Sequence, residues 1–294
     1  MTILFLALML SGTFALGISD VLRRKHLKDG LNDQALLVIT LFLTGILLLP
    51  ILVLVGIPEI EDGFWSAVAI TGFLNLISQN LFVRAFKLSD ASLIAPLRLI
   101  IPPLVIFTGF LFLNEKPSLA GVVGIFITMS GLWFLLGGGK IFRYQNRQSS
   151  IKDRGVAYGL IGSVLFAASF PFDKIAVVRS SALFATFFIF TSLGILTYVI
   201  NMMYDRKFTT TVIESFTQHC KAHMLISLFS SVGVVLTNQA LHYSLVAYAS
   251  SLKRLQALWT VVIAGKFLEE REMGRRAIAT LLMFIGILPS VFLN

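Results

Sequence analysis

Two adjacent cations, Lys253 and Arg254, lie near the start of a long apolar stretch. Their neighbours on the chain carry no acidic group: they are Ser250, Ser251, Leu252, Leu255 and Gln256. A charge inside an apolar helix is costly in lipid, so it usually faces water or a compensating anion. A guanidinium can hold a carboxylate or a phosphate through two hydrogen bonds, and a lysine adds a point charge. We therefore predict that the pair binds an anionic group; the alternative is that both side chains snorkel to the membrane surface.

Two further cations, Lys174 and Arg98, lie near the ends of other apolar stretches. Lys174 is expected on the same side of the membrane as Lys253 and Arg254, and we predict that it assists them, although Asp173 is its neighbour. Arg98 corresponds to Lys253 in an internal repeat and is predicted to lie toward the opposite face of a shared cavity, as a relay or gate. For both residues the alternative is again snorkelling to the interface.

Amide side chains occur within two of the apolar stretches. Asn75 and Gln79 are four residues apart and share one face of a helix, and Asn238 and Gln239 lie in a later stretch. Amides in lipid need hydrogen-bonding partners, so they turn toward other helices. Two interpretations remain open, the lining of a substrate cavity and contacts that only join helices.

Four acidic residues lie inside or at the ends of apolar stretches. Asp20 and Asp173 lie just inside theirs and are candidates for coupling transport to a proton. Glu115 and Glu270 end two stretches and are expected to bond to backbone groups or to neighbouring basic residues.

The sequence contains no motif that indicates metal binding or standard enzyme chemistry. His219, Cys220 and His223 have a helical spacing, but no acidic residue or second cysteine lies beside them, so we expect a solvated loop and no metal. No Gly-x-Ser-x-Gly, His-Glu-x-x-His, P-loop or Gly-x-Gly-x-x-Gly motif is present. We therefore expect no cofactor and no enzymatic activity.

The composition requires lipid as the main solvent. The chain has 294 residues, of which 56% are hydrophobic and only 13% charged, and its mean hydropathy is +0.87. Soluble domains carry about 25% charged residues. The net charge of +9 comes from basic residues in the short gaps between apolar runs, so it indicates membrane orientation rather than binding to nucleic acid.

The apolar runs predict an all-α integral membrane protein. A bilayer core about 30 Å thick needs about 20 apolar residues per helix. On this basis we expect ten spans, near residues 3–22, 34–56, 64–83, 91–113, 118–136, 155–178, 182–203, 222–241, 247–268 and 274–293.

The two halves of the chain repeat one another. The matched pairs are Phe112–Lys116 with Phe267–Arg271, Arg98 with Lys253, Gly131 with Gly286, and Asp20 with Asp173. Five spans per half is an odd number, so the second half must cross the membrane with opposite polarity, as in many secondary transporters. The predicted units are residues 1–136 and 155–294, separated by a basic linker at 137–154.

Loop charges predict the orientation. Most basic residues fall in the odd-numbered loops, whereas the charges of Ile57–Gly63 are all acidic. By the positive-inside rule the odd loops are cytoplasmic and both termini face outward. We expect a plasma or inner membrane protein.

Two five-span halves that each close with Phe-Leu-x-Glu and a basic residue resemble the drug/metabolite transporter superfamily, and within it the ten-helix EamA-type members. The resemblance covers nearly the whole chain. It implies a basket of helices around a central cavity that opens alternately to each side of the membrane.

A second likeness is local. Ser250–Arg254 resembles the Lys-Arg pair of the phosphate-translocator branch of the same superfamily, which carries sugar phosphates and nucleotide sugars, and Lys174 falls near the place of a further lysine of that branch. The resemblance implies that these three cations bind phosphate.

Together these features predict a secondary transporter of a small anionic solute, with phosphate preferred over carboxylate. The alternatives are an exporter of amino acids or amphipathic metabolites, a flippase for a lipid-linked intermediate and, in a different class, a membrane enzyme or scaffold. The expected partners are the small-molecule substrate and membrane lipids, and the chain is expected to act as a monomer or homodimer.

Overall fold

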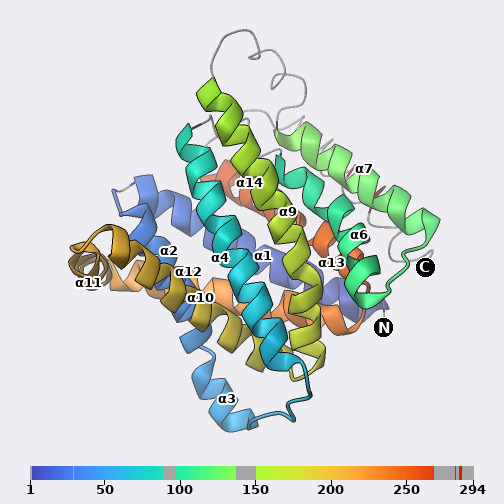
Figure 1. Ribbon diagram of the computed structural model, residues 1–294, viewed down its shortest axis with the longest axis horizontal. Coiled ribbons are helices and arrows are strands. Elements are labelled where there is room, and N and C mark those ends of the chain that lie inside the picture. Colours follow the sequence, from blue (N-terminus) through green and yellow to red (C-terminus); the bar gives the residue numbers. More distant parts are fainter. Residues whose placement is uncertain are drawn as a thin grey trace.

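The computed structural model describes residues 2–28, 30–88, 94, 97–136, 150–267, 282 and 285–286. Within them every regular element is a helix, as the all-α prediction requires (Figure 1). The elements, with η marking short 3₁₀ turns, are α1 (Thr2–Lys28), α2 (Asp33–Ile46), α3 (Leu49–Val55), α4 (Phe64–Leu88), η1 (Arg98–Ile100), α6 (Ile101–Leu113), α7 (Leu119–Leu136), α9 (Ser150–Val178), α10 (Ala182–Tyr204), α11 (Phe208–Gln218), α12 (Cys220–Gln239), η2 (Ala240–His242), α13 (Val246–Leu252) and α14 (Leu255–Phe267).

Within the described ranges, six segments are long and apolar enough to cross a membrane: Ile3–Leu27, Asp33–Val55, Phe64–Ala85, Arg154–Val178, Ala182–Tyr204 and Cys220–His242. They coincide with six of the predicted spans. Two shorter apolar helices, Arg98–Leu113 and Leu119–Gly131, lie where the fourth and fifth spans are predicted. The predicted tenth span falls almost wholly outside the described residues, as do residues 137–149 of the linker.

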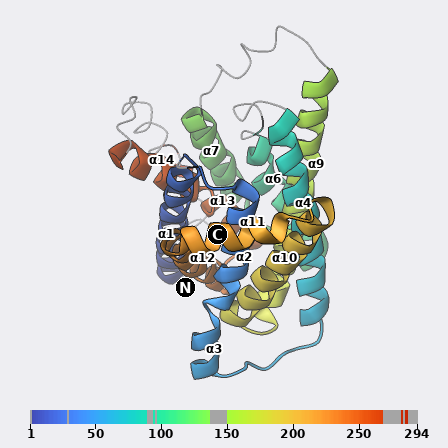
Figure 2. The ribbon, with the colours of Figure 1, turned by 90° about the vertical axis from the view of Figure 1, so that its left-hand side faces the viewer.

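The structure differs from the predicted boundaries in two places. Helix α9 begins at Ser150, so the last five residues of the predicted linker are helical. The predicted seventh loop contains a helix, α11. A long apolar run does not mark it in the sequence, because α11 has one apolar and one polar face. Figure 2 shows α11 lying across the ends of longer helices rather than along them.

A groove of about 400 Å³ lies between α11 and the two helices beneath it. It is lined by residues of α2, α10 and α11: Val38, Ile39, Phe42, Leu43, Gly194, Ile195, Tyr198, Val212, Ile213, Phe216 and Thr217. Almost all of these side chains are apolar, so the groove offers no partner for an anionic solute.

The helices of the two halves pack in equivalent ways. In chain order, α1 matches α9, α2 matches α10, and α4 matches α12. With this matching, the contact of α4 with α9 corresponds to that of α12 with α1. The contact of α1 with α14 then corresponds to that of α9 with α6, and the contact of α2 with α12 to that of α10 with α4. This set of matched contacts is what a two-fold relation between the halves produces.

Helices α2 and α10 meet at a reciprocal glycine contact. A Cβ atom placed on Gly45 would lie 2.8 Å from the backbone nitrogen of Thr191, and one on Gly194 would lie 2.7 Å from that of Phe42. Phe42 precedes Gly45 by three residues, and Thr191 precedes Gly194 by three. Because each glycine contacts the residue one turn before the other, the contact has the form expected at a two-fold axis.

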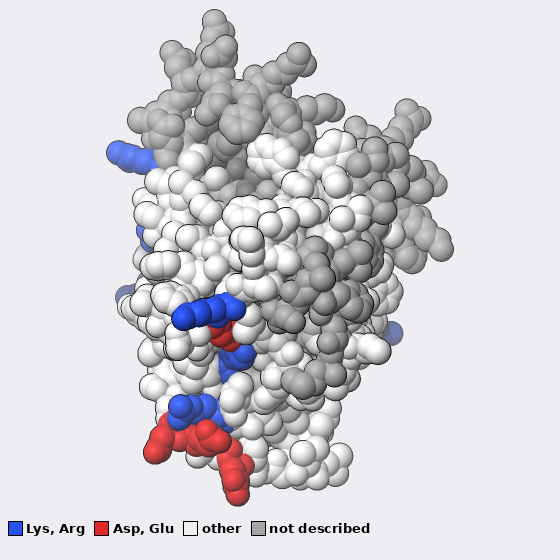
Figure 3. All heavy atoms as spheres, turned by 90° about the vertical axis from the view of Figure 1, so that its right-hand side faces the viewer, with Lys and Arg blue, Asp and Glu red and all other residues white. Residues whose placement is uncertain are grey.

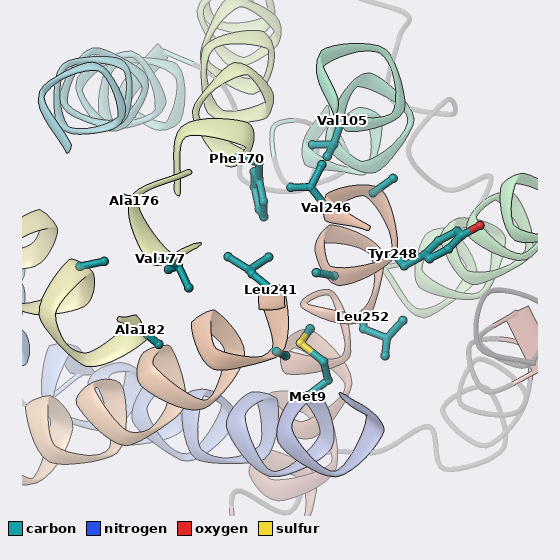
Figure 4. Packing of buried hydrophobic residues seen from close by; sticks show 14 of the residues in the cluster. Met9, Val105, Phe170, Ala176, Val177, Ala182, Leu241, Val246, Tyr248 and Leu252 are labelled. Carbon is teal, nitrogen blue, oxygen red and sulfur yellow. The ribbon is translucent and has the colours of Figure 1, made fainter. Parts of the chain in front are cut away.

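The hydrophobic core lies where α1, α9, η2 and α13 meet. Figure 4 shows Met9, Phe170, Val177, Leu241 and Leu252 converging there from these elements. The outer surface is also largely apolar, and on the face in Figure 3 the charged atoms of the described residues gather in a few small groups. Exposed apolar side chains such as Phe107, Phe126 and Leu228 suit a surface in contact with lipid.

Candidate functional site

The predicted ninth span, 247–268, is broken at its two cations. Helix α13 ends at Leu252, and α14 begins at Leu255, so Lys253 and Arg254 form the turn between them. Within the turn the amides of Arg254 and Gln256 bond three residues back, which is the tighter 3₁₀ pattern. The hydroxyl of Ser250 also donates to the carbonyl of Ala247 at 2.8 Å, and such bonds compete with the helical pattern and bend helices.

The predicted fourth span is irregular at the corresponding place. Arg98 begins the 3₁₀ turn η1, and α6 follows with prolines at positions 102 and 103. Proline has no N–H, so neither can continue a regular helical bond back to the preceding turn. Arg98 and Lys253, which match in the sequence repeat, therefore both lie where a span is discontinuous. In secondary transporters discontinuous helices commonly form the substrate site.

Five charged side chains form a continuous row through these two breaks. Asp173 interacts electrostatically with Lys253, and Lys253 with the adjacent Arg254. Arg254 interacts in turn with Arg98, and Arg98 with Asp20. The row therefore brings together residues of α1, α9, the α13–α14 turn and η1, with a carboxylate at each end and three cations between them.

Asp173 is held by a chain of hydrogen bonds between α4 and α9. The Thr71 hydroxyl donates to Asp173 Oδ1 at 2.5 Å, and Asn75 Nδ2 donates to the Thr71 oxygen at 3.1 Å. Ser169 Oγ donates to Asn75 Oδ1 at 3.2 Å. The sequence prediction missed Thr71, although it lies one turn before Asn75 on the face that also carries Gln79, and this spacing could have identified it.

Lys253 has polar and aromatic neighbours. Its Nζ lies 3.4 Å from Asn238 Oδ1, and Asn238 Nδ2 donates to Thr186 Oγ1 at 2.9 Å. The ammonium also lies 5.2 Å from the centre of the Phe170 ring, within the range of a cation–π interaction. Of the predicted amides, Asn75 and Asn238 thus belong to the network around Lys253 and Asp173. Gln239 is half-buried at the end of α12 and has no bond within this network.

Asp20 is bound by side chains of α14. Gln256 Nε2 donates to Asp20 Oδ2 at 2.7 Å, and Thr260 Oγ1 lies 3.4 Å from the same oxygen. The two aspartates match in the sequence repeat, and each faces the cation at one break. The pairs Asp20–Arg98 and Asp173–Lys253 are therefore equivalent under exchange of the halves.

Arg254 lies in the middle of the row. Its Nε is buried without a hydrogen-bond partner among the described residues, and so is Gln79 Oε1. Arg254 and Lys253 are half-buried, whereas Arg98 is exposed and its guanidinium carbon lies 4.1 Å from the centre of the Phe82 ring. These cations therefore keep accessible surface inside the predicted spans, where a charge needs water or an anion to compensate it.

Lys174 lies in a separate group of contacts. Its Nζ is 2.6 Å from Glu115 Oε1 and donates to the carbonyl of Ser244 at 2.7 Å. The other carboxylate oxygen, Glu115 Oε2, accepts from the amide of Val246 at 2.7 Å. The ammonium is thus already compensated by a carboxylate. Glu115 was expected to bond to local backbone or to neighbouring basic residues, but both partners, Lys174 and the amide of Val246, come from the other half of the chain. Glu270 lies outside the described residues.

Several other polar and aromatic side chains take part in packing. Tyr248 is fully buried and its hydroxyl accepts from the amide of Ser118 at 3.0 Å. Trp259 donates to Thr13 Oγ1 at 3.2 Å. The expected solvated loop around the histidines is wrong for His223, which is buried at the start of α12 with Nε2 3.0 Å from Ser215 Oγ, because α11 covers it. No metal-binding cluster of three or more side chains occurs among the described residues.

Comparison with known proteins gives one family and one fold. The model of the EamA-like transporter family matches the chain twice, over residues 3–137 and 153–292. A solved structure described only as "Crystal structure of protein" superposes with a TM-score of 0.76 at 12% sequence identity, covering 98% of this chain and 97% of that chain. A search of curated proteins gives no significant match.

Proposed function

Because the chain belongs to the EamA-like transporter family, and is therefore a multi-pass membrane protein of a transporter family, we propose that it moves a small organic anion by alternating access, without ATP. The observation that carries this proposal is the row of charges at the two broken spans. Its three cations and two carboxylates lie on the two discontinuous segments and on the first helix of each half.

The chemistry of the row supports an anionic substrate. The two outer cations each have an aspartate beside them, whereas Arg254 has a cation on either side. A half-buried guanidinium between two like charges is unfavourable unless an anion or water compensates it. Arg254 is therefore the residue at which the anionic group of the substrate binds, and Lys253 and Arg98 contribute their charges from either side.

The paired arrangement supports alternating access. Two equivalent aspartate–cation pairs, one per half, allow the two halves to exchange conformations about their common axis and expose the row first to one side and then to the other. We further propose ten spans in inverted five-span halves around a central cavity, in a plasma or inner membrane, with the odd-numbered loops in the cytoplasm.

Transport assays in proteoliposomes test this function. Small organic anions are first screened by the thermal stabilisation of the purified protein, because a ligand that binds only the native state raises its stability. The selected anion should then enter protein-containing vesicles without ATP, and Arg254→Ala should raise the concentration for half-maximal uptake by about ten- to a hundredfold. Uptake by Arg254→Ala equal to that of the wild type, or anions that neither bind nor move, would contradict the proposal.

A further inference from the structure

The five charges of the row do not cancel. Among the described residues the row contains Lys253, Arg254 and Arg98 against Asp173 and Asp20, so its formal charge is +1. Both carboxylates accept hydrogen bonds, from Thr71 and from Gln256, which hold them in place beside the cations. Counted in formal charges, the described part of the row therefore carries one cation in excess.

The excess cation also breaks the symmetry of the halves. Lys253 corresponds to Arg98, and Asp173 to Asp20, but the position that corresponds to Arg254 is Leu99, which is uncharged. The symmetric part of the row is thus two neutral aspartate–cation pairs. Arg254 adds a single positive charge between them, and in the part of the chain that the structure describes its buried Nε has no hydrogen-bond partner.

We propose that this row of charges selects a singly charged anion, such as one carboxylate or one phosphodiester, over a doubly charged one. The inference rests on the proposed function and names the substrate class of the same site. One negative charge makes the row neutral. A second charge would leave it at −1 between two carboxylates that cannot move away without breaking their hydrogen bonds, and an uncompensated charge is costly away from bulk water.

This assignment differs from the expectation that phosphate is preferred over carboxylate. A phosphate monoester carries about −1.5 to −2 at pH 7, more than the row can compensate. The face of α4 that carries Thr71 and Asn75 also offers a polar group to the uncharged part of the substrate. Gln79 Oε1, on that face, is a buried acceptor without a partner among the described residues, so a hydroxyl or an N–H group of the substrate suits it.

The experiment compares anions that differ by one charge. Affinities are measured by thermal shift for matched pairs: butyrate with succinate, valerate with glutarate, and dimethyl phosphate with methyl phosphate. In each pair that binds, the wild type should bind the monoanion at least about tenfold more tightly. Asp173→Asn and Asp20→Asn are isosteric and raise the row to +2, so each should shift the ratio toward the dianion by about tenfold or more.

Glu115→Gln is the matched control. It removes one carboxylate from the protein, but that carboxylate pairs with Lys174 outside the row, so the ratio should not change. If one aspartate variant fails to fold, the other and Arg254→Gln still test the idea, since Arg254→Gln should weaken binding of every monoanion. A wild type that prefers dianions, or aspartate variants with an unchanged ratio, overturns the inference and leaves anion transport intact. If no anion binds to the wild type, the proposed function itself fails.

Discussion

The Lys174 ammonium lies 2.6 Å from the Glu115 carboxylate, and the other oxygen of that carboxylate binds the backbone amide of Val246. Three segments distant in sequence are joined at this point: the end of α6, the end of α9 and the start of α13. The contact connects the two halves. It therefore concerns stability more directly than anion binding.

The first prediction separates these two roles for Lys174. Glu115→Ala should destabilise the protein by about 3 kcal/mol, because it leaves a partly buried ammonium uncompensated. Lys174→Gln should lower the unfolding temperature while anion affinity changes less than twofold (about 0.4 kcal/mol). Lys116→Gln, at a neighbouring exposed cation, is the control and should change neither. If Lys174→Gln loses anion affinity at unchanged stability, Lys174 belongs to the anion site.

The second prediction ranks the two cations of the broken span. Arg254→Ala should weaken anion binding by about ten- to a hundredfold, the value of one charge-assisted contact. Lys253→Ala should weaken it less, because its charge is already balanced by Asp173. Lys253→Arg should reduce anion affinity less than Lys253→Ala does, but the loss should still be measurable. Equilibrium binding of the anion found by screening measures all three, and wild-type affinity in both alanine variants would favour snorkelling.

The third prediction concerns orientation. A cysteine placed within Ile57–Gly63 should react with a membrane-impermeant reagent in intact cells. The native Cys220, exposed at the start of α12, should react only after the membrane is opened. The loop charges give this direction by the positive-inside rule. Labelling of Cys220 alone in intact cells would reverse the assignment.

The fourth prediction tests the reciprocal glycine contact. Gly194→Ala places a methyl group 2.7 Å from the Phe42 backbone nitrogen and should cost about 1–3 kcal/mol through overpacking. Gly72→Ala in α4 is the control, because nothing lies within 4 Å of its new Cβ atom. That variant should be neutral or slightly stabilised, since alanine favours helices over glycine by about 0.5–1 kcal/mol. Equal unfolding temperatures for the two variants would show that the contact is loose.

Much of the fold could be predicted from the sequence, because a bilayer of fixed thickness requires apolar runs of a fixed length. The six long spans were found in this way. The break at Lys253 could not be, since the residues that cause it include no proline or glycine and the run stays apolar on both sides. Helix α11 is short and amphipathic, so a criterion based on the length of apolar runs does not detect it.

For the candidate site, the sequence repeat gave the pairs Arg98–Lys253 and Asp20–Asp173. It could not show which aspartate faces which cation, because those contacts join different helices. It also could not show that Lys174 meets Glu115, since the two residues are far apart on the chain and bring opposite charges from different halves. Which charges remain uncompensated depends on tertiary packing, and a single sequence contains that information only indirectly.

The glycine contact between α2 and α10 has a consequence for motion. When two equivalent halves exchange conformations, points on their common axis return to the same place, while points far from it move most. The contact of Gly45 with Thr191, mirrored by Gly194 with Phe42, has the form expected on such an axis. If the halves exchange conformations as proposed, we expect the distance across this contact to stay constant while the distances across the two aspartate–cation pairs change in opposite directions.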